Sequence, residues 1–325
     1  MLPLNLFQGR NDRKMGLKEE LANLAPPKDT IITIGVFDGV HMGHRYLLEN
    51  VKQRAREKNL LSGVVTFDRH PQSALQSGKD LPWLNEVEEK VKLLQETGID
   101  LVIVISFTPE VAQLSAREFV SLLKKHLKMH SLVVGPDFAL GRGREGNINL
   151  LRRLAQEMEF NVEAIAPFTT DGEIVSSTLI RQALAQGDMI KVEKLLGRYF
   201  YLVGNVIAAD KRGRILGFPT ANLDIPPQQA LPDNGVYATI AYIAEQGFAS
   251  ATNIGTRPTF GNPESSSGKR TVETHLLNYE GNLYGKKIKV EFIQKLRDEQ
   301  NFASAEELKA QINKDIQEIK EALSS

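Results

Sequence analysis

The chain has 325 residues, 42% of them hydrophobic and 25% charged, which is enough for two domains that each bury a core. Its 40 basic and 40 acidic residues balance, so we expect no nucleic-acid partner, because such proteins usually carry a basic excess. The sequence contains no cysteine, which excludes disulfides, thiolate nucleophiles and cysteine-based zinc sites. It has no apolar run of membrane-spanning length and no secretory signal, so we expect a cytoplasmic protein without a membrane partner.

Residues 1–186 are predicted to form an α/β domain with a doubly wound parallel sheet. Short apolar, β-branched runs alternate there with helical patterns, as in successive βαβ units. Ligands of such sheets bind at the carboxyl ends of the strands. The expected strands are 31–37, 61–67, 101–106, 132–135 and 162–166, and the expected helices are 44–58, 86–96, 115–128, 147–158 and 178–186.

Residues 187–325 are predicted to form an antiparallel β-barrel with a terminal helix. Strand-like runs with a period of two follow one another there, separated by turn clusters rather than by helices. Ser304 and Glu307 have the spacing of a capping box and open a helix that extends to about residue 323. We expect 187–198 to be the connection between the domains. The expected strands are 201–208, 236–244, 248–254, 272–277 and 287–293.

The segment GVFDGVHMGH, at residues 35–44, is the most informative motif of the chain. It follows the first expected strand and places His41 and His44 where a helical pattern begins. A helix N-terminus presents unpaired N–H groups that suit a phosphate, and Gly43 removes a side chain that would keep the phosphate from the backbone. The histidines can hydrogen-bond oxygens that gain charge during displacement at phosphorus. An isolated pair is more often a polar cap, but the strand and the glycines favour a phosphate site.

Three further segments are expected at the same sheet edge. TFDRHP, at 66–71, ends the second strand with an aromatic ring and an imidazole. GPDFALGRGREGN, at 135–147, brings glycines that let a phosphate or base approach the backbone. SSTLIR, at 176–181, opens a helix with hydroxyls and places Arg181 one turn later, as an anion clamp would require. The alternatives are a proline-fixed turn, an exposed loop and an ordinary N-cap.

In the second half, two strand-like segments carry the chemistry. Thr220 and Asn222 alternate onto one face, so a hydroxyl and an amide oxygen can reach the same Mg²⁺. Glu273 shares a face with His275, and a carboxylate there can accept the proton of a substrate hydroxyl that attacks phosphorus. For each segment taken alone, the alternative is that these are ordinary polar residues on a barrel rim without a catalytic role.

In these motifs the chain resembles the bifunctional bacterial riboflavin kinase/FAD synthetase family, from about residue 15 to the C-terminus. The resemblance implies that the barrel phosphorylates the ribityl 5′-hydroxyl of riboflavin with MgATP to give FMN. The parallel-sheet domain would then transfer AMP from a second ATP to FMN, giving FAD and pyrophosphate. Both steps would be direct in-line displacements that depend on positioning and charge neutralisation. The implied partners are small molecules (riboflavin, FMN and ATP) with Mg²⁺ as the cofactor, and the sequence leaves homo-oligomers open.

The resemblance also assigns roles to individual residues. The catalytic residues would be His41, His44, Arg181 and Glu273. In the adenylyltransferase, ATP would contact Gly35, Phe37, Asp38, Gly39, Gly43, Asp137, Ser177 and Thr178, and flavin would contact Phe67, His70, Pro71 and Asn147. In the kinase, ATP would contact Gly213, Gly217, Pro219, Thr220 and Asn222, flavin would contact Arg297, and Thr220 with Asn222 would hold the metal.

The sequence departs from the family pattern at two of these segments. Arg69 stands where the family commonly has a proline, beside the expected flavin site, and Asp137 stands where some relatives carry asparagine. The main alternative function is a single-activity adenylyltransferase with an accessory flavin-binding barrel. A flavin- or nucleotide-binding protein without activity and a nucleotidyltransferase with another acceptor are further alternatives.

Overall fold

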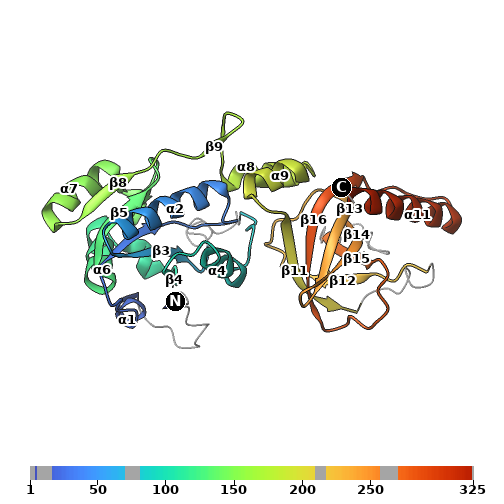
Figure 1. Cartoon of the computed structure of the whole chain (residues 1–325), viewed down its shortest axis with the longest axis horizontal. Coiled ribbons are helices and arrows are strands. Elements are labelled where there is room, and N and C mark those ends of the chain that lie inside the picture. The colour runs from blue at the N-terminus through green and yellow to red at the C-terminus, as the bar shows by residue number, and fades with distance from the viewer. Residues whose placement is uncertain (1–3, 6–16, 70–80, 209–216, 257–269, 324–325) are drawn as a thin grey trace. The chain divides into compact units, whose positions relative to one another are not determined.

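The computed structural model describes residues 4–5, 17–69, 81–208, 217–256 and 270–323. The chain divides into two compact units, Met1–Ser176 and Ser177–Ser325. The first unit contains a parallel sheet flanked by helices, and the second contains a closed barrel (Figure 1). The predicted combination of an α/β domain and a β-barrel domain is therefore confirmed.

The sheet of the first unit is parallel throughout and reverses its strand order in the middle. Its order is β1-β4-β3-β2-β5-β8. From β2 the chain builds outward through β3 to β4 on one side, and then through β5 to β8 on the other. This reversal creates a switch point at the carboxyl ends of β2 and β5, where ligands of doubly wound sheets bind. The strands are β1 (Leu4–Asn5), β2 (Thr30–Ile34), β3 (Leu61–Phe67), β4 (Leu101–Ile105), β5 (Met129–Val134) and β8 (Asn161–Ala164).

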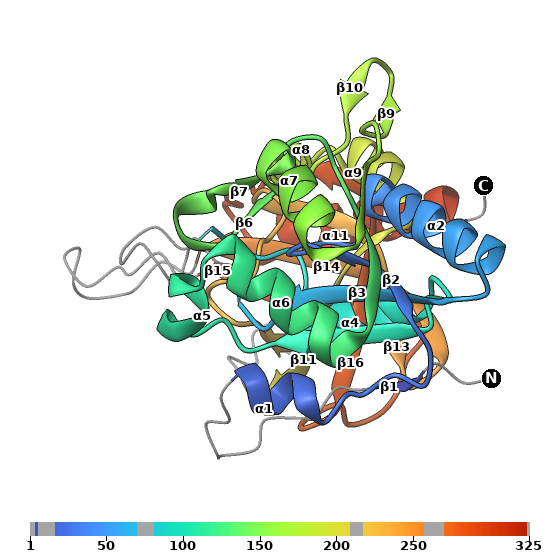
Figure 2. The same cartoon turned by 90° about the vertical axis from the view of Figure 1, so that its left-hand side faces the viewer.

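Helices cover both faces of this sheet, which explains why all five residues of β2 are buried. One face packs with α1, α6 and α7 into a continuous apolar core, and α1 lies beside α6 (Figure 2). On the other face α2 packs on β2, β3 and β5, while α4 contacts β4. The helices of this unit are α1 (Leu17–Ala22), α2 (Met42–Glu57), α4 (Val87–Gln95), α5 (Pro109–Gln113), α6 (Ala116–Leu127) and α7 (Ile148–Met158).

Two short hairpins extend from the first unit. One consists of β6 (Ala139–Leu140) and β7 (Gly146–Asn147), joined through the 3₁₀ turn η1 (Arg142–Arg144). The other consists of β9 (Thr169–Thr170) and β10 (Glu173–Ile174), which Asp171 and Gly172 connect with φ angles of 51° and 79°. Positive φ at both central residues is the signature of a tight type I′ hairpin turn.

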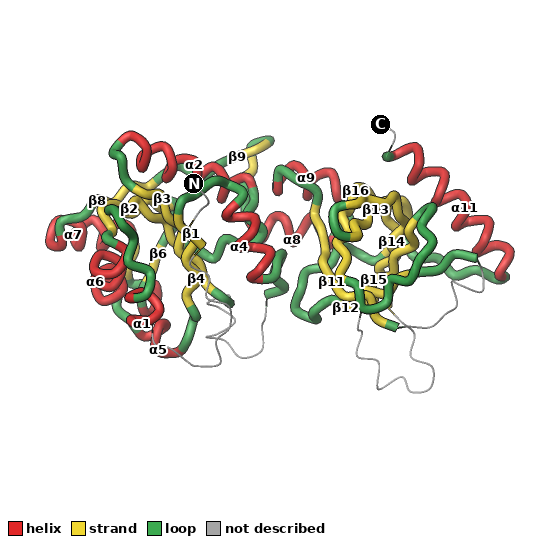
Figure 3. The backbone as a smooth tube through the Cα atoms, turned by 60° about the horizontal axis from the view of Figure 1, so that its bottom comes forward, coloured by secondary structure: helices red, strands yellow, loops and turns green. Residues whose placement is uncertain are grey.

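The second unit is a closed six-stranded barrel with helices at its N- and C-terminal sides (Figure 3). Every neighbouring pair of strands is antiparallel, and β11 closes the barrel against β16 in the order β11-β12-β15-β14-β13-β16. The elements are α8 (Ser177–Ala185), α9 (Met189–Leu196), β11 (Phe200–Ile207), β12 (Ala221–Asp224), β13 (Gly235–Ile243), β14 (Gln246–Thr256), β15 (Arg270–Leu276), β16 (Lys287–Arg297) and α11 (Ala305–Ala322).

The barrel interior combines aromatic packing with buried hydroxyls. The Phe292 ring lies 6.1 Å from that of Phe200 and 5.4 Å from that of Tyr237, between ring centroids. Beside this packing, hydroxyls on three neighbouring strands satisfy one another in a chain of hydrogen bonds, so their burial leaves no oxygen of the group unpaired. The hydroxyls are those of Thr239, Ser250, Thr252 and Thr274.

Two expectations about local structure were wrong. The first strand ends at Ile34 rather than at residue 37, because Phe37, Gly39 and Val40 adopt positive φ angles that no strand tolerates. The connection expected at 187–198 contains a helix, α9, whose buried face is apolar. Asp188 caps its N-terminus and Gly197, with a φ angle of 69°, ends it.

Candidate active sites

The first candidate site begins in the loop that leaves β2. The Gly35 N–H donates to the Val65 carbonyl at 3.0 Å, and the loop then turns through Phe37, Gly39 and Val40 with φ angles of 52°, 84° and 41°. Positive φ is uncommon outside glycine and strained for a β-branched valine. Phe37 and Val40 are buried, so packing holds the strained turn that delivers the histidines to the start of α2.

The two histidines form a stacked pair at the N-terminus of α2. His41 is the N-cap, and its Nδ1 accepts a hydrogen bond from the His44 N–H at 3.3 Å. Because Nδ1 accepts, the neutral ring of His41 carries its proton on Nε2. The two rings are 3.6 Å apart between centroids and 17° from parallel, and Phe37 packs on His44 from another side. The polar cap and the predicted phosphate site are therefore the same feature.

His44 is held in its neutral form. Burial lowers its pKa well below 6.5, and the nearby His41 and Lys90 lower it further. Its Nδ1 is buried and has no hydrogen-bond partner among the described residues. A buried ring nitrogen without a partner at a helix N-terminus leaves hydrogen-bonding capacity for a ligand.

A buried lysine donates hydrogen bonds to the backbone where this loop begins. Lys90, on α4, is 5% exposed, and its Nζ donates to the carbonyls of Val36 and Phe67 at 3.1 and 2.7 Å. Burial lowers the pKa of Lys90 to about 8, while Asp38 and Asp68 oppose that shift. The charged group therefore joins the ends of β2 and β3.

Asp38, predicted to contact ATP, anchors the loop to the segment before α4. Its Oδ1 accepts hydrogen bonds from the N–H groups of Leu84 and Asn85, at 2.9 and 3.4 Å, and the residue is 6% exposed. Trp83 directly precedes Leu84, and its indole Nε1 is buried without a hydrogen-bond partner among the described residues. Asp38 thus fixes the position of the loop.

The other predicted residues of the first unit lie at the ends of strands. Phe67 ends β3 and packs edge-on against Phe107, and Arg69 is exposed beside Asp68. Asp137 is exposed in the turn after β5, and Asn147 caps α7 by accepting from the N–H groups of residues 149 and 150. His70 and Pro71 lie outside the described residues.

Ser177, Thr178 and Arg181 lie in the first turns of α8, at the start of the second unit. Ser177 and Arg181 are four residues apart and so share a helix face. Two residues before α8, the carbonyl of Val175 would be 3.1 Å from a Cβ added to Gly43. This close approach within the first unit explains why the motif needs glycine there.

The second candidate site is a row of polar side chains on three barrel strands. Asn222 on β12 lies directly opposite Glu273 on β15, and Glu273 lies directly opposite Asn253 on β14. Directly opposed residues of antiparallel strands point to the same face. Val272 and Thr274, on the other face of β15, are buried, so the row faces out of the barrel. Asn222 is nevertheless 6% exposed.

The segment before β12 is held against this row. The Nδ1 atom of His275 is 2.8 Å from the carbonyl oxygen of Pro219, and the Phe218 ring packs edge-on against His275. Thr220, half-buried, follows directly, and Gly217 is exposed with a φ angle of 89°. The structure thus brings Pro219 and Asn222 beside Glu273 and His275, while Gly213 lies outside the described residues.

Arg297, predicted to contact flavin, is engaged by the terminal helix. Its guanidinium donates through Nε and Nη2 to the carboxylate of Asp315 on α11, at 2.9 and 2.8 Å. Asp315 is 3% exposed and also accepts from Gln311. This bidentate pair anchors α11 to the end of β16.

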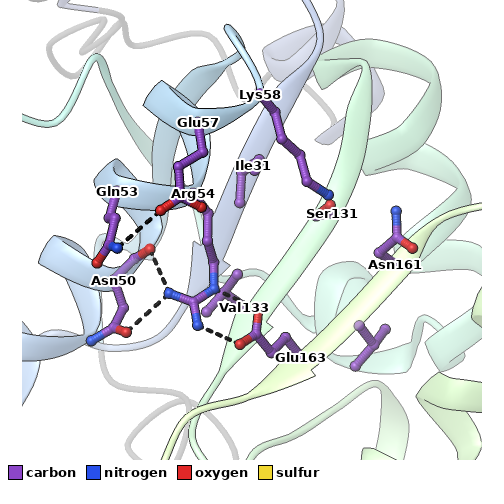
Figure 4. Close-up of a pocket in the computed structure, with 11 residues that line it drawn as sticks. Ile31, Asn50, Gln53, Arg54, Glu57, Lys58, Ser131, Val133, Asn161 and Glu163 are labelled. Carbon is purple, nitrogen blue, oxygen red and sulfur yellow. Dashed lines mark hydrogen bonds and ion pairs between the residues drawn. The ribbon is translucent and has the colours of Figure 1, made fainter.

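A separate open pocket of about 570 Å³ lies between the C-terminal half of α2 and strands β2, β5 and β8 (Figure 4). None of the predicted site residues lines it. Its main charged groups, Arg54 and Glu163, bind each other, and Arg54 also donates to Asn50. This pocket is distinct from both candidate sites.

The described residues contain no cluster of three histidine, aspartate or glutamate side chains that could hold a metal ion. The row at Asn222 is a different kind of donor set, with an amide oxygen and a carboxylate on adjacent strands and the Thr220 hydroxyl two residues away. Such hard oxygen donors fit Mg²⁺, which keeps several water or phosphate ligands.

Comparison with known proteins matches both halves of the chain. A family model for FAD synthetase matches residues 24–179, and one for riboflavin kinase matches residues 196–323. The chain is 40% identical over 293 residues to the bifunctional riboflavin kinase/FMN adenylyltransferase of Escherichia coli strain K12, which covers 90% of this chain and 92% of that relative. This chain belongs to the bifunctional riboflavin kinase/FMN adenylyltransferase family.

Two further comparisons cover nearly the whole chain. The member from Pseudomonas fluorescens is 38% identical over 304 residues, covering 93% of this chain and 96% of that protein. A crystal structure described as a macrolide-efflux protein from Streptococcus pneumoniae has a TM-score of 0.83 at 25% identity, over 98% of this chain and 99% of that one. In the described part of this family member, no helix has the length and apolar content needed to cross a bilayer.

Sequence reasoning missed two residues that the structure places at these sites. Lys90 reads as one lysine in a charged amphipathic helix, where exposure is the usual outcome. The strand pattern does not single out Asn253 as a neighbour of Glu273, although the two residues are directly opposed on β14 and β15. The available signal for Asn253 was its place as a polar residue near the carboxyl end of an expected strand, two residues before Gly255.

Proposed function

We propose that this chain converts riboflavin to FAD in two ATP-dependent steps. The barrel is the riboflavin kinase, and the parallel-sheet domain is the FMN adenylyltransferase. The observation that carries this proposal is that two separate family models, for FAD synthetase at 24–179 and for riboflavin kinase at 196–323, match the two halves of the chain. We place the domain boundary near residues 186 and 187 and the protein in the cytoplasm.

In the kinase step, the 5′-hydroxyl oxygen of riboflavin attacks the γ-phosphorus of ATP. The bond from that phosphorus to the bridging oxygen breaks, and ADP leaves with the electron pair. Glu273 accepts the proton of the attacking hydroxyl, which is the role that a carboxylate has in other phosphoryl-transfer enzymes. Thr220 and Asn222 would hold Mg²⁺, which neutralises phosphate charge when bound.

In the adenylyl step, a phosphate oxygen of FMN attacks the α-phosphorus of the second ATP, and pyrophosphate leaves. The attacking oxygen already carries charge, so this step needs no general base. The N–H groups at the start of α2 and the ring of His41 donate to oxygens of the α-phosphate. His44 acts as a neutral donor, since its pKa lies well below 6.5. Ser177, Thr178 and Arg181 hold the outgoing pyrophosphate.

A chromatographic time course of purified protein with riboflavin, ATP and Mg²⁺ tests this proposal. FMN should form first and then give way to FAD. FMN that accumulates without FAD would limit the chemistry to the barrel. FAD that forms from added FMN but not from riboflavin would support the alternative of a single-activity adenylyltransferase with an accessory barrel.

A further inference from the structure

Lys90 is a buried cation in the first unit that the reaction above does not use. Two carbonyls accept its hydrogen bonds: that of Val36, two residues beyond the end of β2, and that of Phe67, the last residue of the adjacent strand β3. The Val36 carbonyl also accepts a hydrogen bond from the Thr66 hydroxyl at 2.9 Å. Lys90 therefore reaches from α4 to the point where the histidine loop leaves β2.

The charge of Lys90 lies close to the groups that shape the adenylyl site. Asp38 follows β2, Asp68 follows β3, and both favour the protonated ammonium. On α2, the same ammonium disfavours a second positive charge on His44, as His41 also does. The lysine thus acts on the loop through two hydrogen bonds and on the histidine through its charge.

We propose that Lys90 is a positioning residue for adenylyl transfer, which holds the strained histidine loop against the end of β3. This inference rests on the proposed adenylyltransferase function of the same site. Lys90 is 5% exposed and donates to the Val36 carbonyl, so it acts through the loop and not on the substrate. A loop that carries two non-glycine residues at positive φ is strained, so contacts from outside the loop are needed to hold its shape.

Lys90→Met tests the proposal, with Lys92→Met as the matched control. Lys92 lies two residues along the same helix, but its side chain is 61% exposed and pairs with Glu89. We expect Lys90→Met to lower kcat for FAD formation from FMN by about tenfold or more. FMN formation from riboflavin, measured on the same sample, should not change, and Lys92→Met should change neither activity.

The pH profile separates positioning from a merely structural role. Without the positive charge at position 90, the pKa of His44 should rise toward its ordinary value, while Asp38, Asp68 and His41 remain. The acid limb of kcat/KM for FAD formation should therefore move to higher pH in Lys90→Met. Lys90→Arg, which keeps the charge, should leave the limb in place and recover part of kcat.

Two results would overturn the proposal. One is wild-type FAD formation by Lys90→Met. The other is a loss of activity, in protein that circular dichroism shows to be folded, without any shift of the acid limb. If Lys90→Met does not fold, the comparison of Lys90→Gln with Lys90→Arg decides in the same way. Wild-type protein that forms no FAD would instead contradict the proposed function itself.

Discussion

At the scale of single residues, the neutral ring of His44 makes a direct prediction for the adenylyl step. His44→Ala removes the donor that we propose for the α-phosphate, so FAD formation from FMN should fall by about 100-fold to 1000-fold. FMN formation should be unchanged, because Glu273 and Asn222 lie in the other unit. His126→Ala, on α6, is the control, and FAD formation at wild-type rate by His44→Ala would contradict the assigned role.

Glu273 makes the complementary prediction for the kinase step. Glu273→Gln keeps the shape of the side chain but cannot accept the hydroxyl proton, so FMN formation should fall by about 100-fold or more. FAD formation from added FMN should continue at the wild-type rate. Glu245→Gln, in the exposed turn between β13 and β14, should leave both rates unchanged. A kinase rate that survives in Glu273→Gln would mean that another group takes the proton.

The buried ammonium of Lys90 predicts a pH dependence of stability. Burial lowers its pKa from 10.5 to about 8. The folded state therefore binds fewer protons than the unfolded state between these values, and the free energy of unfolding rises with pH across that window. The protonated lysine costs roughly 3 kcal/mol below the window. In urea unfolding, the free energy of unfolding of wild type should therefore rise relative to that of Lys90→Met between about pH 8 and pH 10.5, and a constant difference between the two proteins would contradict this.

At the scale of elements, the pattern of apolar residues predicted most strands and helices. The strands of the parallel sheet are covered on both faces and appear in the sequence as continuous apolar runs. It failed where elements are short or exposed. The β9–β10 hairpin has two-residue strands that carry no period. The eight residues of α9 lie in the segment expected to be a connection, although Asp188 and Gly197 cap them as a helix.

The candidate sites also contain parts that the sequence predicts and parts that depend on how the elements pack. The order of strands and helices placed the histidines at a strand end, since every strand of a parallel sheet ends at the same edge. The row of Asn222, Glu273 and Asn253 depends on the register of three strands, which the sequence does not encode locally. The burial of Lys90 depends on the packing of α4 against the ends of β2 and β3, far away in the sequence.

The anchoring of α11 by one ion pair predicts a large effect of a single substitution. Asp315→Ala leaves the guanidinium of Arg297 without its carboxylate, and removing one partner of a buried pair costs about 3–5 kcal/mol. The melting temperature of the barrel should fall accordingly, whereas Lys314→Ala, one residue away and exposed, should not change it.

If Arg297 also contacts flavin, Arg297→Met should raise the KM for riboflavin beyond the effect of lost stability.

At the scale of the whole molecule, α8 gives the two activities different minimal fragments. A fragment of residues 1–176 lacks Ser177, Thr178 and Arg181 and should form no FAD, whereas 1–186 should recover the activity. On the other side, the Asp233 N–H donates to the Leu184 carbonyl at 2.8 Å. A fragment of residues 177–325 should therefore unfold at a higher temperature than 187–325, and equal melting temperatures would contradict a supporting role of α8.

The single tryptophan gives the molecule a built-in optical label. Trp83 lies in the first unit and directly precedes Leu84, whose N–H binds the Asp38 carboxylate of the histidine loop. The second unit contains tyrosines and phenylalanines but no tryptophan. Indole emission therefore originates in the adenylyltransferase half of the chain. Nucleotide or flavin arrival at one of two similar ligand sites can thus be watched in the intact, unmodified protein.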